Sequence, residues 1–140
     1  MNNLENIEKF VNSNLTTKIN NSLINHNEIK FKIDSEDLTE VIMFLKNNEK
    51  TKFKQLIDIT AVDYPEKDQR FKMIYFFLSH EFNSRANVEF SIKENEIVSS
   101  LTSIFPSANW MEREVFDMYG VSFKDHPDLR RILTDYNFKG

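Results

Sequence analysis

The sequence of 140 residues contains no cysteine and only two glycines, Gly120 and Gly140. Without cysteine the chain cannot form a disulfide, bind an iron–sulfur cluster or zinc through thiolates, or use a cysteine nucleophile. A single internal glycine cannot supply the glycine-rich loop that brings backbone amides against the phosphates of a nucleotide. We therefore expect none of the common NADH or ATP fingerprints in this chain.

Charge and hydropathy disfavour two further classes of protein. The formal net charge is −4, whereas a domain that binds nucleic acid is usually basic. No run of about 20 apolar residues is present, and the asparagine-rich N-terminus lacks the pattern of a secretory signal. The three histidines show no spacing typical of metal ligands. We expect no nucleic-acid partner, and membrane contact only through other proteins.

Apolar periodicity predicts helices in the first half of the chain and strands in the middle. Helical spacing predicts amphipathic helices over residues 3–13 and 38–45, and Asp34 or Ser35 is expected to cap the second. Residues 71–78 form a nearly continuous apolar run, which is typical of a central strand covered on both sides. The segments expected as strands are residues 18–24, 28–33, 53–62, 71–78 and 88–92.

The order of these segments predicts a two-layer α+β fold. The first two strands are expected to form a hairpin, and the last three an antiparallel meander because no helix separates them. We expect one domain over residues 1–140, with a mostly antiparallel or mixed sheet of about five strands and helices packed on one face.

A short helix is predicted over residues 110–119, with a signal at each end. Asn109 and Glu112 have the spacing of a capping box, and Gly120 follows the helix at the position that prefers a left-handed backbone. Upstream, residues 99–101 are expected to open a short helical segment that ends before Pro106.

The charges on this helix allow three interpretations. At about 100° per residue, Glu112 and Glu114 point apart, while Arg113 and Asp117 are neighbours one turn apart. These groups could form surface ion pairs, dock a partner, or provide acid–base chemistry in which Glu112 or Glu114 acts with His126.

An arginine pair, Arg130 and Arg131, follows the helix in a segment rich in aromatic residues. Arginine and aromatic side chains are enriched in protein interfaces, although the same residues could simply pack the tail onto the domain.

Two C-terminal segments together resemble the signature of one protein family. Residues 109–123 read NWMEREVFDMYGVSF, and residues 126–136 read HPDLRRILTDY. Residues 58–65, 70–75 and 83–85 also resemble that family, so that the similarity extends from residue 53 to the end of the chain. The family is the 30-kDa subunit, also called the NuoC family, of respiratory complex I, the proton-pumping NADH:quinone oxidoreductase.

The resemblance implies a non-catalytic structural subunit of the peripheral arm of that complex. It would dock to the 49-kDa-type subunit, which is designated D in bacteria, contact other peripheral-arm subunits and support electron transfer from NADH to quinone. It would carry no cofactor, because FMN, the iron–sulfur clusters and quinone belong to other subunits. It would lie on the cytoplasmic face of the bacterial inner membrane, or on the matrix face of the mitochondrial inner membrane.

The resemblance also assigns roles to particular residues, none of them catalytic, cofactor-binding or metal-binding. The residues expected to contact a partner or to position such contacts are Glu112, Arg113, Glu114, Asp117, His126, Arg130 and Arg131. Family members generally continue past the glycine that matches Gly140, so the C-terminal extension of the family is expected to be absent. The alternatives are a related subunit of a membrane hydrogenase or NDH-type complex, and a stand-alone interaction module.

Overall fold

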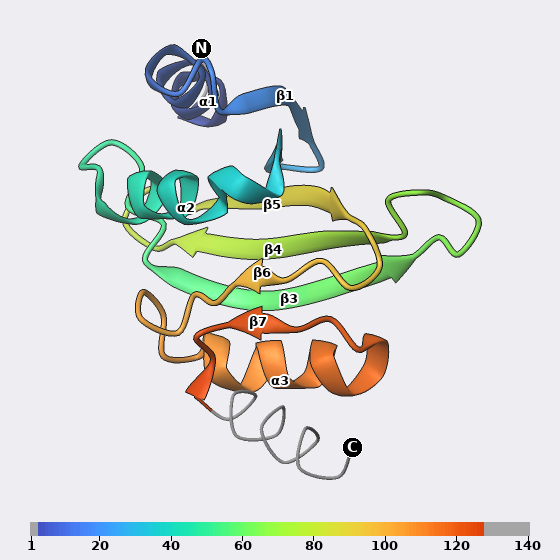
Figure 1. The fold of residues 1–140 in the computed structure, drawn as a ribbon. Helices are drawn as coiled ribbons and strands as arrows, with labels where there is room; N and C mark the ends of the chain where they lie inside the picture. Colours follow the sequence, from blue (N-terminus) through green and yellow to red (C-terminus); the bar gives the residue numbers. More distant parts are fainter. Residues whose placement is uncertain (1–2, 128–140) are drawn as a thin grey trace, which may run out of the picture.

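A computed structural model describes residues 3–127, which form a five-stranded sheet, three α-helices and a separate strand pair (Figure 1). The sheet has the strand order β1-β2-β5-β4-β3. In chain order the elements are α1 (Asn3–Asn14), β1 (Ile19–Asn25), β2 (Glu28–Ile33), the 3-10 turn η1 (Ser35–Asp37), α2 (Leu38–Asn47), β3 (Gln55–Asp63), β4 (Phe71–Ser79), β5 (Ser84–Ile92), β6 (Val98–Ser99), α3 (Ala108–Tyr119) and β7 (Phe123–Lys124).

The sheet is mixed, as its pairing shows. β1 and β2 form an antiparallel hairpin, β2 runs parallel to β5, and β3, β4 and β5 form an antiparallel meander. His26 and Asn27 have φ angles of 52° and 63°, because a two-residue hairpin turn needs positive φ at both central positions. The predicted hairpin and meander are both confirmed.

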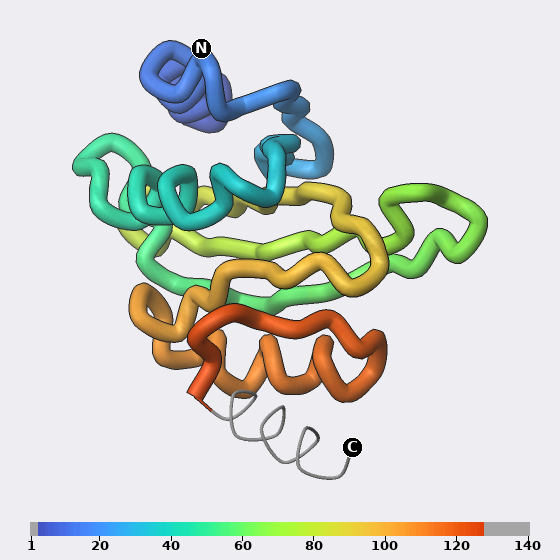
Figure 2. Tube along the Cα trace, viewed as in Figure 1, coloured from blue at the N-terminus to red at the C-terminus, as the bar shows by residue number. Residues whose placement is uncertain are grey.

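One face of the sheet forms the core. Phe31, Val88, Tyr75 and Ile59 are neighbours across four adjacent strands, and all four are buried. The helices cover this same face, since their buried side chains belong to the same apolar cluster. In Figures 1 and 2, α2 lies toward the β5 side of the sheet and α3 toward the β3 side. The expected α+β fold with helices on one face is confirmed.

The other face of the sheet has no helix of residues 3–127 packed on it, which corrects the expectation for β4. That strand alternates between buried and half-buried positions, so it is covered on one face only. Its apolar run arises because Ile74 and Phe76, which point to the uncovered face, are as apolar as the core residues between them. We refer to this uncovered side as the open sheet face.

Two local predictions are wrong, the helix cap at Asp34 or Ser35 and the helical segment that opens at residues 99–101. Asp34 and Asp37 precede η1 and α2, but neither side chain makes a capping hydrogen bond, and the Ser35 hydroxyl instead donates to Glu96 Oε2 at 2.8 Å. Residues 99–105 contain a short strand and turns, and no helix. The strand β6 pairs in parallel with β7, so the chain on both sides of α3 is joined by a small second sheet.

Candidate functional site

The helix α3 presents two chemically different sides. Its buried side carries Ala108, Glu112 and Val115. It ends at Gly120, which has a φ of 73° and donates its N–H to the carbonyl of Phe116 at 2.8 Å. Such a left-handed residue closes the last helical turn, and the predicted role of Gly120 is confirmed.

Glu112 is a buried side chain that links α3 to the segment after β6 through two hydrogen bonds. Its Oε1 accepts a hydrogen bond from the Ser100 hydroxyl, and its Oε2 accepts one from the backbone N–H of Leu101, both at 2.7 Å. Glu112 therefore does not form the predicted capping box with Asn109, and Ser107 precedes the helix without a side-chain cap. The carboxylate satisfies donors that are distant in sequence, a role that spacing alone does not reveal.

His126 completes this buried cluster. Its Nε2 lies 3.9 Å from Glu112 Oε1 and 2.9 Å from the backbone carbonyl of Asn109. Because a carbonyl can only accept, Nε2 carries a proton and donates to Asn109. His126 thus fixes the chain after β7 to the first turn of α3.

Electrostatics in this cluster are set mainly by burial. Desolvation raises the pKa of Glu112, against the lowering effects of the Leu101 amide, the Ser100 hydroxyl and His126. Desolvation also raises the pKa of Tyr75, and the negative charge of Glu112 adds to that effect. Glu112 and His126 are both 0% exposed, so a substrate cannot reach this pair for acid–base chemistry in the described conformation.

The outer side of α3 is a stripe of surface side chains, which we call the α3 stripe. It consists of Trp110, Arg113, Glu114, Asp117 and Met118, whose spacing of three and four residues places them along one side of a helix. Trp110 is 69% exposed and Met118 is 74% exposed. Between them, Arg113 Nε donates to Asp117 Oδ1 at 3.2 Å. Exposed aromatic and sulfur-containing side chains beside arginine are typical of protein interfaces.

The structure thus separates the residues that the sequence grouped together. Glu112 and His126 lie inside the domain, where positioning is the role open to them, while Arg113, Glu114 and Asp117 lie on the surface. Arg130 and Arg131 lie outside the described residues. Sequence reasoning named Met118 only as part of the family signature, although its place one turn after Glu114 was a usable signal.

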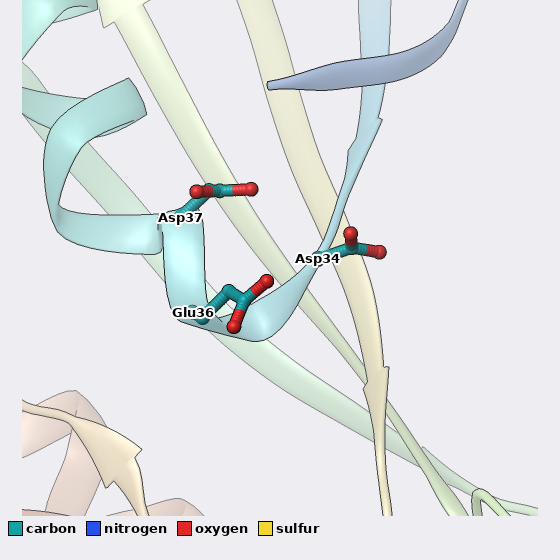
Figure 3. Close-up of side chains that lie close together, drawn as sticks. All are labelled: Asp34, Glu36 and Asp37. Carbon is teal, nitrogen blue, oxygen red and sulfur yellow. The ribbon is translucent and has the colours of Figure 1, made fainter. Parts of the chain in front are cut away.

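An acidic cluster formed by η1 and the residue before it has three carboxylates close enough together to bind a metal ion. One carboxylate oxygen from each of Asp34, Glu36 and Asp37 lies within 4.8 Å of the others (Figure 3). However, Asp37 is paired with Lys18 Nζ at 3.3 Å, and Asp34 accepts a hydrogen bond from Asn20 at 2.9 Å. Exposed carboxylates with such partners are common on protein surfaces.

Within residues 3–127, no helix has the length and apolar character needed to cross a membrane.

Comparison with known proteins identifies relatives over most of the chain. A family model described as the 30 Kd subunit of respiratory-chain NADH dehydrogenase matches residues 31–140. The NADH-quinone oxidoreductase subunit designated C in Ruegeria pomeroyi is 50% identical over 113 residues, covering 81% of this chain and 56% of that relative. The subunit with the same designation in a Chelativorans species is 38% identical over 137 residues, covering 98% and 68%.

A plant relative has a different name. NADH dehydrogenase (ubiquinone) iron-sulfur protein 3 of Beta trigyna is 50% identical over 111 residues, covering 79% of this chain and 58% of that relative. The chain spans little more than half the length of the Ruegeria and Beta relatives.

Two solved structures have the same fold. The trypsin-resistant fragment (1-134) of Nqo5 superposes with a TM-score of 0.74 at 24% identity, covering 90% of this chain and 98% of the fragment. A chain of a membrane-bound sulfane sulfur reductase, an archaeal respiratory membrane complex, superposes with a TM-score of 0.78 at 21% identity, covering 89% and 72%. At these identities the likeness concerns the fold.

Proposed function

Because the chain belongs to the family of the 30-kDa subunit of respiratory-chain NADH dehydrogenase, we propose that it is a non-catalytic structural subunit of a complex I-type NADH:quinone oxidoreductase. It would sit in the peripheral arm and support electron transfer from NADH to quinone. The observation that carries this proposal is the α3 stripe, which lies within the matched residues 31–140. A subunit that acts by assembly needs such a surface, whereas the buried Glu112 and His126 offer nothing to a substrate.

The partner we propose for the α3 stripe is the 49-kDa-type subunit of the same complex. Trp110 and Met118 would fill apolar hollows on that partner. Arg113 and Asp117, which form an ion pair with each other in the free chain, would also pair with polar groups of the partner. Glu112 and His126 would hold α3 in place from inside the domain. Other peripheral-arm subunits would complete the assembly, and the chain would reach the inner membrane only through the complex, on its cytoplasmic or matrix face.

We also propose that these 140 residues hold no redox cofactor. The Beta trigyna relative is named an iron-sulfur protein, but this sequence has no cysteine thiolate with which to bind a cluster. Its single internal glycine, Gly120, ends a helix and does not open a phosphate-binding loop. Flavin, clusters and quinone would therefore be bound by neighbouring subunits.

The proposal is tested by purifying the tagged chain from its native membranes and identifying the bound chains by mass spectrometry. We expect the 49-kDa-type subunit among them, and we expect the double change Trp110→Ala and Met118→Ala to lower its recovery about tenfold, which corresponds to about 1.4 kcal/mol of binding free energy. Ile97→Ala is the matched control, since Ile97 is 62% exposed but lies outside α3.

Arg113→Ala should also weaken assembly more than it weakens the isolated fold, because an exposed pair one turn apart adds only about 0.3–0.5 kcal/mol to folding.

The outcome of the purification also decides between related complexes. Recovery of hydrogenase or NDH-type subunits in place of the 49-kDa-type subunit would favour the alternative that the chain is a related subunit of one of those complexes. The same fold does occur in another respiratory membrane complex. Unchanged recovery after loss of both Trp110 and Met118 would remove the α3 stripe from the proposal, and steady NADH oxidation by the pure chain would contradict the non-catalytic role.

A further inference from the structure

The two edge strands of the sheet, β1 and β3, differ in how they are protected (Figure 1). An edge strand presents unpaired backbone N–H and C=O groups, and charged side chains, bulges or a covering element usually keep other chains from pairing with them. β3 has all three protections, because α3 packs against it, it carries Asp58 and Asp63, and its register is irregular near Asp58. β1 reads INNSLIN and contains no charged residue and no proline.

The hairpin geometry shows which backbone groups of β1 are available at the edge. Asn25 and Glu28 close the two-residue turn, so their backbones are hydrogen-bonded to each other. Bonded and non-bonded pairs alternate along an antiparallel ladder, so every second residue of β1, counted back from Asn25, bonds to β2. The N–H and C=O groups of Ser22 and Ile24 therefore point to the outer edge. Among residues 3–127, no strand lies beyond β1.

The side chains of β1 leave this edge open as well. Ser22 points to the covered face, where its hydroxyl accepts a hydrogen bond from Asn12 at 2.9 Å and donates one to Glu8 at 2.7 Å. Leu23 points to the open sheet face and is 54% exposed, although it is a large apolar side chain. The charges nearest to it, Glu8 on α1 and Lys30 on β2, lie one layer or one strand behind the edge.

The sequence of β1 is close to symmetric about Leu23. An asparagine lies two residues away on each side, at Asn21 and Asn25, and the register between them is regular. An antiparallel second copy centred on Leu23 therefore sets Leu23 against Leu23 and each Asn21 against an Asn25, with no charges opposed. In the same register, Ser22 of each copy meets Ile24 of the other, and these are the residues with outward backbone groups. A two-fold contact requires this kind of self-complementary patch.

We propose that the edge of β1 is an interface between two copies of this chain, which pair antiparallel about Leu23 and join their five-stranded sheets into one. The symmetry of the strand selects a second copy as the occupant, because that copy satisfies the backbone groups of Ser22 and Ile24 and covers Leu23 in a single register. One short strand from each copy buries little surface, so the dimer is weak and exchanges with the free chain. The inference does not rest on the proposed function or on the α3 stripe.

Single cysteines test the register directly, because the chain has no cysteine of its own. Leu23→Cys places two thiols on the two-fold axis, in a non-hydrogen-bonded pair whose Cβ atoms are about 4.5–5.5 Å apart. Mild oxidation of the full chain should therefore give a disulfide-linked dimer. Asn21→Cys is the matched control on the same face, since its two copies would be about 14 Å apart along the strands, beyond the reach of a disulfide. We expect at least about tenfold more linked dimer from Leu23→Cys, and equal yields, or more from Asn21→Cys, would refute the register.

Sedimentation velocity of the full chain over a range of concentrations tests the interface without a crosslink. The wild type should shift toward the dimer as its concentration rises. Leu23→Lys brings two like charges opposite each other and should raise the dissociation constant at least about tenfold, whereas Ile97→Lys, at an exposed position outside the sheet, should change it less than about twofold. Urea denaturation of Leu23→Lys confirms that the variant is folded, as its exposed position leads us to expect.

Trp110→Ala separates this inference from the proposed function, because Trp110 belongs to the α3 stripe and lies far from β1 in the sheet order. It should leave the dissociation constant of the dimer within about twofold. A dimer that is lost with Trp110→Ala and kept with Leu23→Lys would refute the β1 interface and assign self-association to α3. A wild-type chain that stays monomeric at all concentrations would also refute the interface and would leave the α3 stripe untouched.

Discussion

At the level of single residues, Glu112 holds two donors from a distant part of the chain. Replacing it by alanine leaves the Leu101 amide and the Ser100 hydroxyl without that acceptor inside the domain. Glu112→Ala should therefore lower the free energy of unfolding by about 2–4 kcal/mol, because hydrogen bonds to charged groups are strong and buried donors left unpaired are costly. Urea denaturation of the purified chain measures the change. Glu114→Ala, two residues away on the exposed side, should change the value by less than about 0.5 kcal/mol.

The protonation of Glu112 gives a second prediction at this scale. Burial raises the pKa of this carboxyl above its usual value of 4.5, so the folded state binds the proton more readily than the unfolded state does. The stabilisation from this group is fully present below that value and is lost as pH rises through the higher pKa of the folded state. The unfolding free energy of the wild type minus that of Glu112→Gln should therefore fall from about pH 4 to about pH 7. A difference that grows with pH would mean that the Leu101 and Ser100 hydrogen bonds outweigh desolvation.

At the level of elements, the C-terminal end of α3 depends on one backbone conformation. Gly120 has a φ of 73°, and a side chain added there would meet no atom of residues 3–127 within 4 Å. Gly120→Ala therefore costs only the left-handed backbone strain, about 1 kcal/mol, which thermal or urea unfolding resolves. Gly120→Asn should cost less, because asparagine tolerates this region, as Asn27, Asn83 and Asn95 of this chain do. A loss well above about 2 kcal/mol for the alanine variant would point to a steric clash that the structure does not contain.

The elements also show what sequence could and could not predict. Periodicity located α1, α2, the β1–β2 hairpin and the β3–β4–β5 meander, because each has its own local pattern of apolar residues. It missed the β6–β7 pair, since strands of two residues carry no period and their partners are far apart in sequence. At the site, the spacing identified the Arg113–Asp117 pair, whereas the burial of Glu112 and His126 depends on Ser100, Leu101 and Asn109 being brought to them by the fold.

At the level of the whole molecule, the helices and the open sheet face give the domain two different sides. The helix α3 packs on the covered side, where Tyr119 meets Phe71 with ring centroids 6.1 Å apart, and Lys32 and Glu89 lie on the reverse side of the sheet. The close-packed core between the two sides holds their separation fixed.

This arrangement predicts that changes on the two sides of the sheet act independently in assembly. Binding of the purified chain to a complex that lacks it should be measured for Trp110→Ala, for Lys32→Glu and for the double variant. Changes that lie far apart and share no partner group add to within about 0.5 kcal/mol, so the loss of binding free energy in the double variant should equal the sum of the two single losses within that margin. A coupling of more than about 1 kcal/mol would require one partner group, or one conformational change, to connect Trp110 with Lys32 through the core. Lys9→Glu in place of Lys32→Glu provides the matched control, because it alters the same total charge on α1 and should cause no loss of its own.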